Sequence, residues 1–195
     1  MLVLYQFQLV ELSLVDMTNY HSNKVKKKIE KYFEEEFDNL KVVGFPFYRK
    51  DVFSYTKPLP YEKKDGILIN GRLEQSNVGL IDRIKKTFQY ENISILHARN
   101  RKEYYNLLNK AKVVISLKIE ETFGIGQLEA YVLGSIPLSP NNYAYPEVIE
   151  NETLLYTDEE DLMDKLAYLL RLDQNSFQMD IEKYEQTISS CVKNL

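Results

Sequence analysis

The sequence predicts an α/β fold in which helices flank a parallel sheet. From residue 66 onward, short apolar runs alternate with longer amphipathic stretches, as in a parallel sheet with crossover helices. The run at residues 113–117 has the length and composition of a strand buried on both faces. A chain of 195 residues, 44% of them hydrophobic, can bury one good core, or one core and part of another. We therefore expect one Rossmann-like domain in the second half of the chain.

Within that half, the pattern predicts strands at residues 66–70, 93–96, 113–117 and 136–139. Helices are expected at residues 78–88, from Asn100 to about residue 111, and at 126–133. Asn100 and Glu103 form a cap pair for the second of these, and Thr157 and Glu160 a capping box for a later helix. A last helix is expected at residues 176–193.

The first 60 residues give a different pattern. They predict helices at residues 2–14 and 22–36 and one strand at 41–44, without enough apolar residues for a core of their own. The segments at 45–47 and 57–60, with three prolines between them, predict an extended linker.

Composition and charge exclude several classes of function. The net charge is −4, and the basic run at residues 24–31 is followed by three glutamates at 34–36, so we expect no nucleic-acid partner. The single cysteine, Cys191, cannot form an internal disulfide, and no signal peptide is evident, which favours a cytoplasmic protein. Two distant histidines give no zinc spacing, and no catalytic triad is evident.

The most informative segment follows the buried run at residues 113–117. It is Glu121-Thr-Phe-Gly-Ile-Gly-Gln-Leu-Glu129, two carboxylates eight positions apart around a glycine turn that leads into a helix. The first N–H groups of a helix lack internal partners and favour anions. The segment therefore predicts a ligand that carries both phosphate and hydroxyl groups.

Four motifs in order resemble the carboxyl-terminal half of GT-B glycosyltransferases of the retaining family 4. They are Gly71-Arg72-Leu73, the Glu121 to Glu129 segment, Gly134-Ser-Ile-Pro137 and Tyr145-Pro-Glu-Val148. The resemblance covers residues 66–172. It implies a domain division into a remnant of the amino-terminal domain with a linker (1–62), a Rossmann-like donor-binding domain (63–174) and a carboxyl-terminal helix (175–195).

The resemblance also implies roles for the two glutamates and for Arg72. Glu121 would lie by the hydroxyls of the donor sugar and Glu129 would hold the two ribose hydroxyls of the nucleotide. Arg72, beside Gly71, would bind the diphosphate and offset the charge of the leaving group, so Glu121 and Arg72 are the expected catalytic residues.

The turn between the glutamates would bind the donor through its backbone. Phe123, Gly124 and Ile125 would present N–H groups, and glycine lets the main chain approach a ligand closely. The resemblance implies no metal ion and no cofactor other than the nucleotide-sugar donor.

Each of these residues has a structural alternative. Glu121 can be a solvated loop carboxylate, Arg72 a surface arginine, and Glu129 a first-turn residue favoured by the helix dipole. The glycine turn can be a tight turn that needs glycine only for its backbone shape. The tyrosines near Pro146 fit core packing better than ligand contact.

One position departs from the family pattern. A lysine is expected about five residues after Arg72, and Asn77 stands there. Lys85 and Lys86 cannot replace it, because the apolar spacing of the helix turns them toward solvent. Losing one leaving-group cation weakens the case for turnover more than the case for binding.

Two functions follow. The first is the donor half of a retaining, metal-independent glycosyltransferase that acts on an acceptor not identified by the sequence, whether glycan, lipid or protein. The second is a non-catalytic nucleotide-sugar-binding module, or the donor subunit of a split transferase whose acceptor domain is a partner chain. Peripheral contact with the inner face of a membrane stays open in both.

Overall fold

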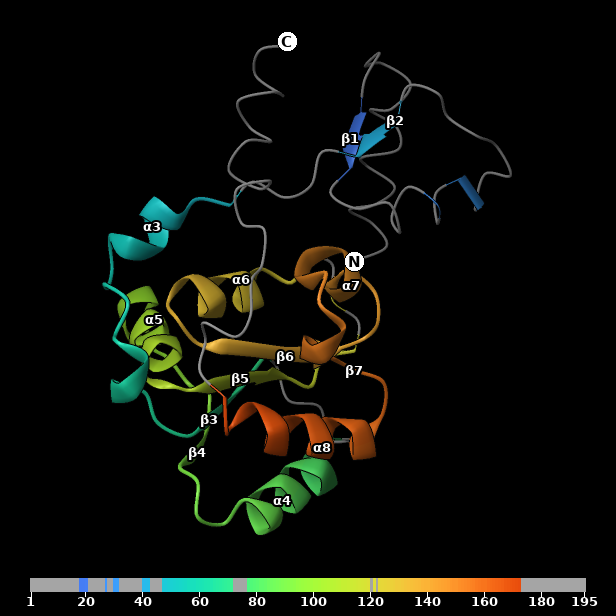
Figure 1. Cartoon of the computed structure of the whole chain (residues 1–195). Coiled ribbons are helices and arrows are strands. Elements are labelled where there is room, and N and C mark those ends of the chain that lie inside the picture. Colours follow the sequence, from blue (N-terminus) through green and yellow to red (C-terminus); the bar gives the residue numbers. More distant parts are fainter. Residues whose placement is uncertain are drawn as a thin grey trace. The chain divides into compact units, whose positions relative to one another are not determined.

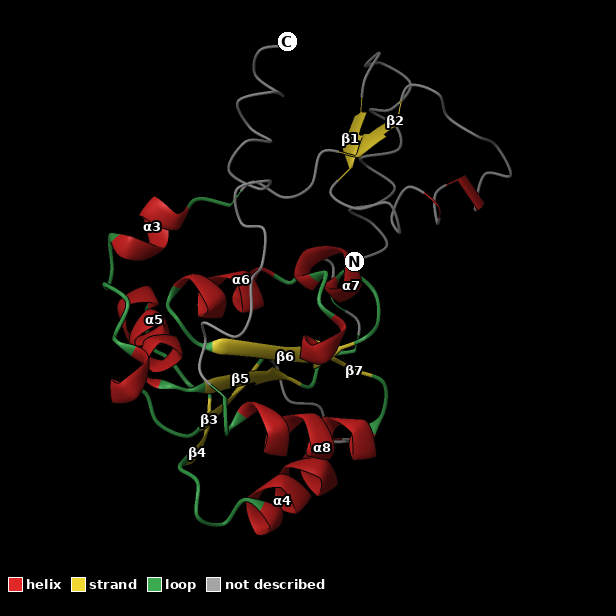
Figure 2. Cartoon of the chain, viewed as in Figure 1, coloured by secondary structure: helices red, strands yellow, loops and turns green. Residues whose placement is uncertain are grey.

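The computed structural model describes residues 18–20, 27, 30–31, 40–42, 47–71, 77–119, 121 and 123–172. The chain forms two compact units, one of residues 1–46 and 186–195 and one of residues 47–185. Figure 1 shows the elements of both, and Figure 2 separates helices from strands.

In the first unit, strand β1 (Thr18–Tyr20) pairs in parallel with β2 (Leu40–Val42). The strand expected at residues 41–44 is confirmed by β2, whereas β1 was not predicted as a strand. The helix expected at residues 2–14 lies outside the described residues. Of the one expected at 22–36, only residues 27, 30 and 31 are described, and all three are helical.

The second unit is built on a five-stranded sheet whose neighbouring strands are all parallel. Its order is β4-β3-β5-β6-β7, with β5 at the centre. The bounds are β3 (Ile67–Asn70), β4 (Ile93–Ile95), β5 (Val113–Ser116), β6 (Ile136–Pro140) and β7 (Leu155–Tyr156). The four predicted strands are confirmed, and β7 is an additional edge strand of two residues.

Helices cover both faces of this sheet (Figure 1). One face carries α5 (Arg101–Lys110), α6 (Ile125–Val132) and α7 (Tyr145–Ile149), and the other carries α4 (Val78–Thr87) and α8 (Glu159–Leu169). The three helices predicted after β3, β4 and β5 are confirmed to within a few residues. This arrangement is the predicted Rossmann-like α/β fold.

The core lies between the sheet and the two helix layers. Every residue of β5 is buried, as expected of a central parallel strand covered on both faces. On α4 the apolar spacing turns Ile81 and Ile84 into the core, and Lys85 and Lys86 are exposed as predicted.

Residues 57–60, predicted to be extended, have no regular secondary structure, but helix α3 (Arg49–Phe53) lies between the two predicted linker segments, and a turn of 3₁₀-helix, η1 (Tyr61–Lys63), follows them. Phe47 and Val52 are buried in the core, and the Tyr61 hydroxyl donates to the Leu172 carbonyl oxygen at 2.8 Å. The prolines at 58 and 60 restrict only their own neighbourhood, so they did not exclude a short helix before them.

The capping box predicted at Thr157 and Glu160 is wrong by one residue. The N-cap of α8 is Asp158, whose Oδ1 accepts from the Asp161 N–H at 3.0 Å, while the Thr157 N–H donates to Asp161 Oδ2 at 2.9 Å. Glu160 instead forms an ion pair with Arg83 of α4 at 2.6 Å. Aspartate and threonine both cap helices well, so sequence alone does not separate adjacent candidates.

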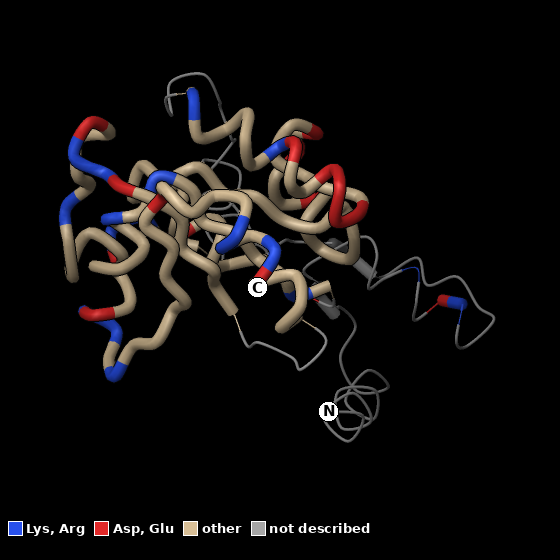
Figure 3. The backbone as a smooth tube through the Cα atoms, turned by 90° about the horizontal axis from the view of Figure 1, so that it is seen from below, with Lys and Arg blue, Asp and Glu red and all other residues tan. Residues whose placement is uncertain are grey.

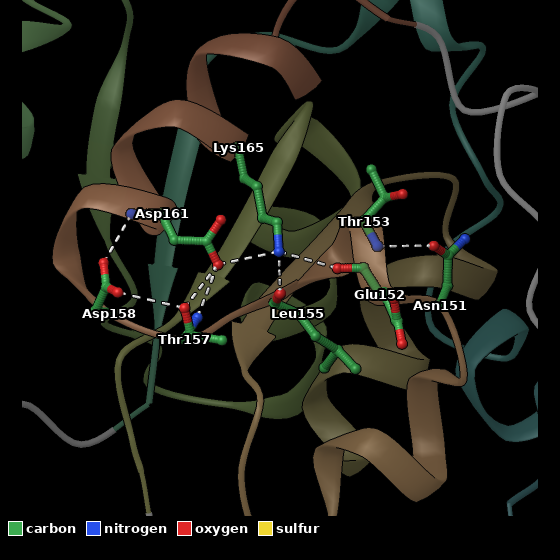
Figure 4. A network of polar contacts seen from close by, with 8 residues as sticks. All are labelled: Asn151, Glu152, Thr153, Leu155, Thr157, Asp158, Asp161 and Lys165. Atoms are coloured by element: carbon green, nitrogen blue, oxygen red, sulfur yellow. Dashed lines mark hydrogen bonds and ion pairs between the residues drawn. The ribbon is translucent and has the colours of Figure 1, made fainter.

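Lys165 closes this network one turn further along α8 (Figure 4). Its Nζ donates to Asp161 Oδ2 and to the Glu152 carbonyl oxygen, both at 3.1 Å, and to the Leu155 carbonyl oxygen. The beginning of α8 is thereby tied to β7 and to the 3₁₀ turn η3 (Glu152–Leu154) before it.

Acidic and basic residues are interspersed along the described backbone (Figure 3). No helix within the described ranges is long and apolar enough to cross a membrane. The carboxyl-terminal helix expected at residues 176–193 lies outside the described part of the chain.

Candidate functional site

Parallel strands bring their carboxyl ends to one edge of the sheet, where α/β folds bind ligands. At this edge β3 ends with Asn70 and continues into Gly71, whose φ of 111° favours glycine. The loop after β5 leads from the same edge into α6. Arg72, the expected diphosphate ligand, lies outside the described residues.

Glu121 orders the loop before α6. Its Oε1 accepts from the Phe123 N–H at 3.2 Å, its Oε2 lies 3.4 Å from Lys118 Nζ, and its carbonyl oxygen accepts from the Ala144 N–H at 3.3 Å. The side chain is 24% exposed. A ligand that used the Phe123 N–H, as the sequence led us to expect, would compete with Glu121 for it.

Gly124 is the N-cap residue of α6, with a φ of 67° in the left-handed region. A Cβ there would lie 3.4 Å from Tyr145 Cδ1, so the conformation, more than the space, requires glycine. Ile125 begins the first turn, in which the Gln127 N–H already donates to the Gly124 carbonyl oxygen at 3.0 Å, so the N–H groups of Ile125 and Gly126 are the ones that come before any acceptor of the helix. The backbone conformation alone accounts for the glycine, so the donor-binding role of the turn stays a prediction.

Glu129 lies in the second turn of α6, because the helix begins at Ile125. The alternative of a first-turn carboxylate favoured by the helix dipole is therefore wrong. Its two oxygens are held separately: the Tyr104 hydroxyl donates to Oε2 at 2.6 Å, and the Tyr105 hydroxyl donates to Oε1 at 2.8 Å. Both tyrosines come from α5, so the carboxylate joins two helices of the same layer.

Burial has the largest effect on the pKa of this group. It raises the pKa of Glu129, and hydrogen bonds from Tyr104 and Tyr105, with the nearby charge of Arg101, oppose that rise. Burial also raises the pKa of both tyrosines, and the Glu129 charge and hydrogen bonds raise it further. Both hydroxyls therefore keep their protons and act as donors.

The beginning of α6 also meets the end of β3. A Cβ on Gly126 would lie 2.7 Å from Asn70 Nδ2 and 3.3 Å from the Tyr104 hydroxyl oxygen, so the Asn70 side chain and that hydroxyl lie near each other. Asn70, Tyr104, Tyr105, Gly126 and Glu129 thus form one group, called here the tyrosine–glutamate cluster. It joins the strand that precedes Gly71 to the helix that follows Glu121.

Three members of this cluster were not predicted from the sequence: Asn70, Tyr104 and Tyr105. The spacing of Tyr104 matches the leucines that follow it, which is typical of the apolar face of a helix. Two adjacent tyrosines near the start of a helix that follows a strand were the available signal, since buried tyrosine hydroxyls need polar partners.

A second set of polar contacts lies at the end of β5, where the loop to α6 begins. Tyr145 is 2% exposed, and its hydroxyl lies 2.6 Å from Ser116 Oγ at the end of β5. The Tyr156 hydroxyl donates to the Ser116 carbonyl oxygen at 2.9 Å. Core packing is therefore the correct interpretation of Tyr145. No three His, Cys, Asp or Glu side chains among the described residues lie together as metal ligands would.

Comparison with known proteins identifies the class to which this fold and site belong. The model of the family "Glycosyl transferases group 1" matches residues 66–187, and the chain belongs to this family. The matched range contains the carboxylate pair, the glycine turn and all five strands of the sheet.

Two particular relatives are informative. The chain is 38% identical over 72 residues to the tRNA-queuosine alpha-mannosyltransferase of Drosophila melanogaster, which is 37% of this chain and 19% of that protein. A crystal structure of a glycosyltransferase from Rickettsia africae ESF-5 superposes with a TM-score of 0.60 at 18% identity, covering 92% of this chain and 59% of that one. The chain spans less than two thirds of each, and the structural likeness shows the fold.

Proposed function

We propose that this chain binds the donor in a glycosyltransferase that moves a sugar from a nucleoside diphosphate sugar to an acceptor. The observation that supports it most is Glu129, a carboxylate held partly buried at the carboxyl edge of the sheet within the matched family range. An acceptor-only group in this position suits a pair of vicinal hydroxyls such as those of ribose.

The proposed roles follow the positions of the groups. Glu129 binds the ribose hydroxyls, and Glu121 accepts hydrogen bonds from the transferred sugar. The N–H groups at the start of α6, together with Arg72 and Gly71, offset the charge of the departing diphosphate. These cationic and dipolar groups take the place of a metal ion.

Transfer with retention is the finer part of the proposal. The name of the Drosophila relative describes an alpha-mannoside as its product. GDP-mannose carries its sugar in the α configuration, so an α product from this donor is formed with retention. A mannosyl nucleotide is accordingly the first donor to test on this chain.

The acceptor is proposed only by class. Glycans, lipids and proteins are the acceptors considered from the sequence, and the name of the relative adds a nucleoside of tRNA. The absence of a nucleic-acid partner, the cytoplasmic location, membrane contact and a separate acceptor-domain chain all stay predictions.

A thermal-shift panel tests donor binding. UDP, GDP, ADP and their sugars, including GDP-mannose, are added to the wild-type chain and to Glu129→Ala. A ligand at 100 times its Kd stabilises the folded state by about 2.7 kcal/mol, so one nucleotide should raise the wild-type Tm by several degrees and the variant Tm much less. The absence of a shift with every nucleotide contradicts the proposal.

A non-catalytic binding module is the second candidate, and Asn77 supports it. This residue stands at the N-cap of α4, where the family resemblance leads us to expect a lysine. A nucleotide that shifts the Tm while the chain neither hydrolyses the donor nor transfers the sugar, with tRNA and candidate partners present, would favour this function. A radiolabelled donor makes slow turnover detectable.

A further inference from the structure

The tyrosine–glutamate cluster fixes the carboxylate of Glu129 at two points. The two hydroxyls come from adjacent residues of α5, and each donates to a different oxygen, at 2.6 and 2.8 Å. A carboxylate bound at one oxygen can still rotate about its last side-chain torsion, which is broad. Donors at both oxygens restrict that rotation.

This arrangement leaves part of the carboxylate available. An ionised carboxylate has about four lone-pair sites, and the two tyrosine hydroxyls use two of them. Glu129 is neither fully buried nor fully exposed. The remaining lone pairs match in number the two hydroxyl donors of a ribose.

Tyr104 also has a polar neighbour on the sheet. The Asn70 side chain, at the end of β3, lies near its hydroxyl, and the missing side chain of Gly126 leaves room for both groups. Tyr105 is 3% exposed and packs against Tyr104 with ring centroids 5.1 Å apart. Phenylalanine would fill the same volume, so the hydroxyls serve the carboxylate and not the packing.

We propose that Tyr104 and Tyr105 are positioning residues that orient Glu129 and thereby set how strongly the protein prefers ribose over deoxyribose in its nucleotide. The inference rests on the proposed function, because it requires a nucleotide to bind at Glu129. Preorganised polar groups bind with a smaller entropic cost than groups that must be ordered by the ligand.

The test compares ribonucleotides with deoxyribonucleotides. Kd values are measured by calorimetry for GDP, UDP and ADP and for their 2′-deoxy forms, with wild type, Tyr104→Phe and Tyr105→Phe. Tyr90→Phe is the matched control, because it makes the same chemical change at a side chain that is 94% exposed. Circular dichroism checks that each variant is folded. If only one of the two tyrosine variants folds, that variant alone is enough to test the inference.

For the nucleotide that binds best, we expect wild type and Tyr90→Phe to prefer the ribose form about tenfold, as for a hydrogen bond to a charged group. In Tyr104→Phe or Tyr105→Phe this ratio should fall at least threefold toward one. A variant that weakens both forms equally, or leaves the ratio unchanged, contradicts the inference.

Two further outcomes separate this inference from the proposed function. A wild-type chain that binds both forms equally contradicts the positioning role and leaves nucleotide-sugar binding intact. A wild-type chain that binds none of the six nucleotides contradicts both.

Discussion

Gly126 is the residue at which the two halves of the candidate site meet. A methyl group there would lie 2.7 Å from Asn70 Nδ2, closer than van der Waals contact allows, although the amide is the end of a side chain and can shift. Any shift would move Asn70 away from the Tyr104 hydroxyl. The glycine is therefore explained by a close approach and not by its backbone conformation.

We predict that Gly126→Ala lowers the free energy of unfolding by about 1–3 kcal/mol, the usual cost of overpacking, and weakens nucleotide binding. Urea denaturation gives the first quantity and calorimetry the second. Alanine otherwise favours a helix over glycine, so a loss of stability would oppose the intrinsic preference.

Gly79 provides a matched control for this substitution. It also lies inside a helix, α4, but a Cβ there meets nothing within 4 Å. Gly79→Ala should raise the free energy of unfolding by about 0.4–1 kcal/mol. If the two substitutions have the same effect, the contact of Gly126 with Asn70 is not tight.

At this scale the sequence located part of the site. The spacing of Glu121 and Glu129 around Gly124 placed both carboxylates correctly about the start of a helix. It could not supply Tyr104 or Tyr105 as partners of Glu129, because those contacts join positions far apart in the chain. Only the packing of α5 on α6 creates them.

Among the elements, α8 shows most clearly how a helix end is fixed. Asp158 accepts from the Asp161 N–H, and Asp161 accepts in return from the Thr157 N–H. Burial alone would raise the pKa of Asp161, but the hydrogen bonds from Thr157 and Lys165 outweigh it and the pKa is lowered. Its contribution to stability is thus present above its unfolded pKa and is lost as the pH falls through the lowered folded value.

We predict that Asp158→Ala lowers the free energy of unfolding by about 1 kcal/mol, the usual effect of removing an N-cap side chain. Thr157→Ala should lower the free energy of unfolding by less, because the Thr157 N–H, which donates to Asp161, is kept in that variant. Urea denaturation at pH 7 compares the two variants. The opposite order would restore Thr157 as the capping residue.

The elements that sequence reasoning found are the ones with long, continuous patterns. The apolar run of β5 and the 3.6-residue spacing of α4 are of this kind. The elements it missed are short: β7 has two residues, and α3 and α7 have five each. Such segments depend on the sheet and core around them, because short helices are not stable alone.

For the second compact unit as a whole, Lys64 is the least usual core residue. It is 3% exposed, and its Nζ donates to the Asn109 carbonyl oxygen and to Asn109 Oδ1 at 3.3 Å, with Ser135 Oγ at 3.4 Å. These contacts join the segment before β3 to the end of α5 and to the start of β6. Burial lowers the pKa of Lys64 to about 8.

This lowered pKa predicts a pH dependence of folding. Between about pH 8 and the ordinary lysine pKa near 10.4, the unfolded chain binds a proton that the folded chain has released, so this group makes stability rise with pH. Wild type should therefore gain stability relative to Lys64→Met between pH 7.5 and 9.5. Urea denaturation at several pH values measures the difference.

The stability of wild type is compared with that of Lys64→Met because buried tyrosines with raised pKa values make the stability of both proteins fall near pH 10. This effect is common to the two proteins and cancels in the difference between them. Lys85→Met, at an exposed lysine of α4, controls for the loss of one positive charge. A gap between wild type and Lys64→Met that stays constant across this pH range would show that the buried amine does not titrate there.

The position of β5 bears on how this unit is synthesised and folds. Its neighbour β6 is separated from it along the chain by one helix, and its neighbour β3 by two helices and strand β4. As the chain leaves the ribosome, β3 and β4 can pair first, but one edge of β3 stays open until β5 emerges. Non-local pairing of this kind is slow, and open strand edges invite aggregation, so the unit's vulnerable period in the cell cannot end before its central strand arrives.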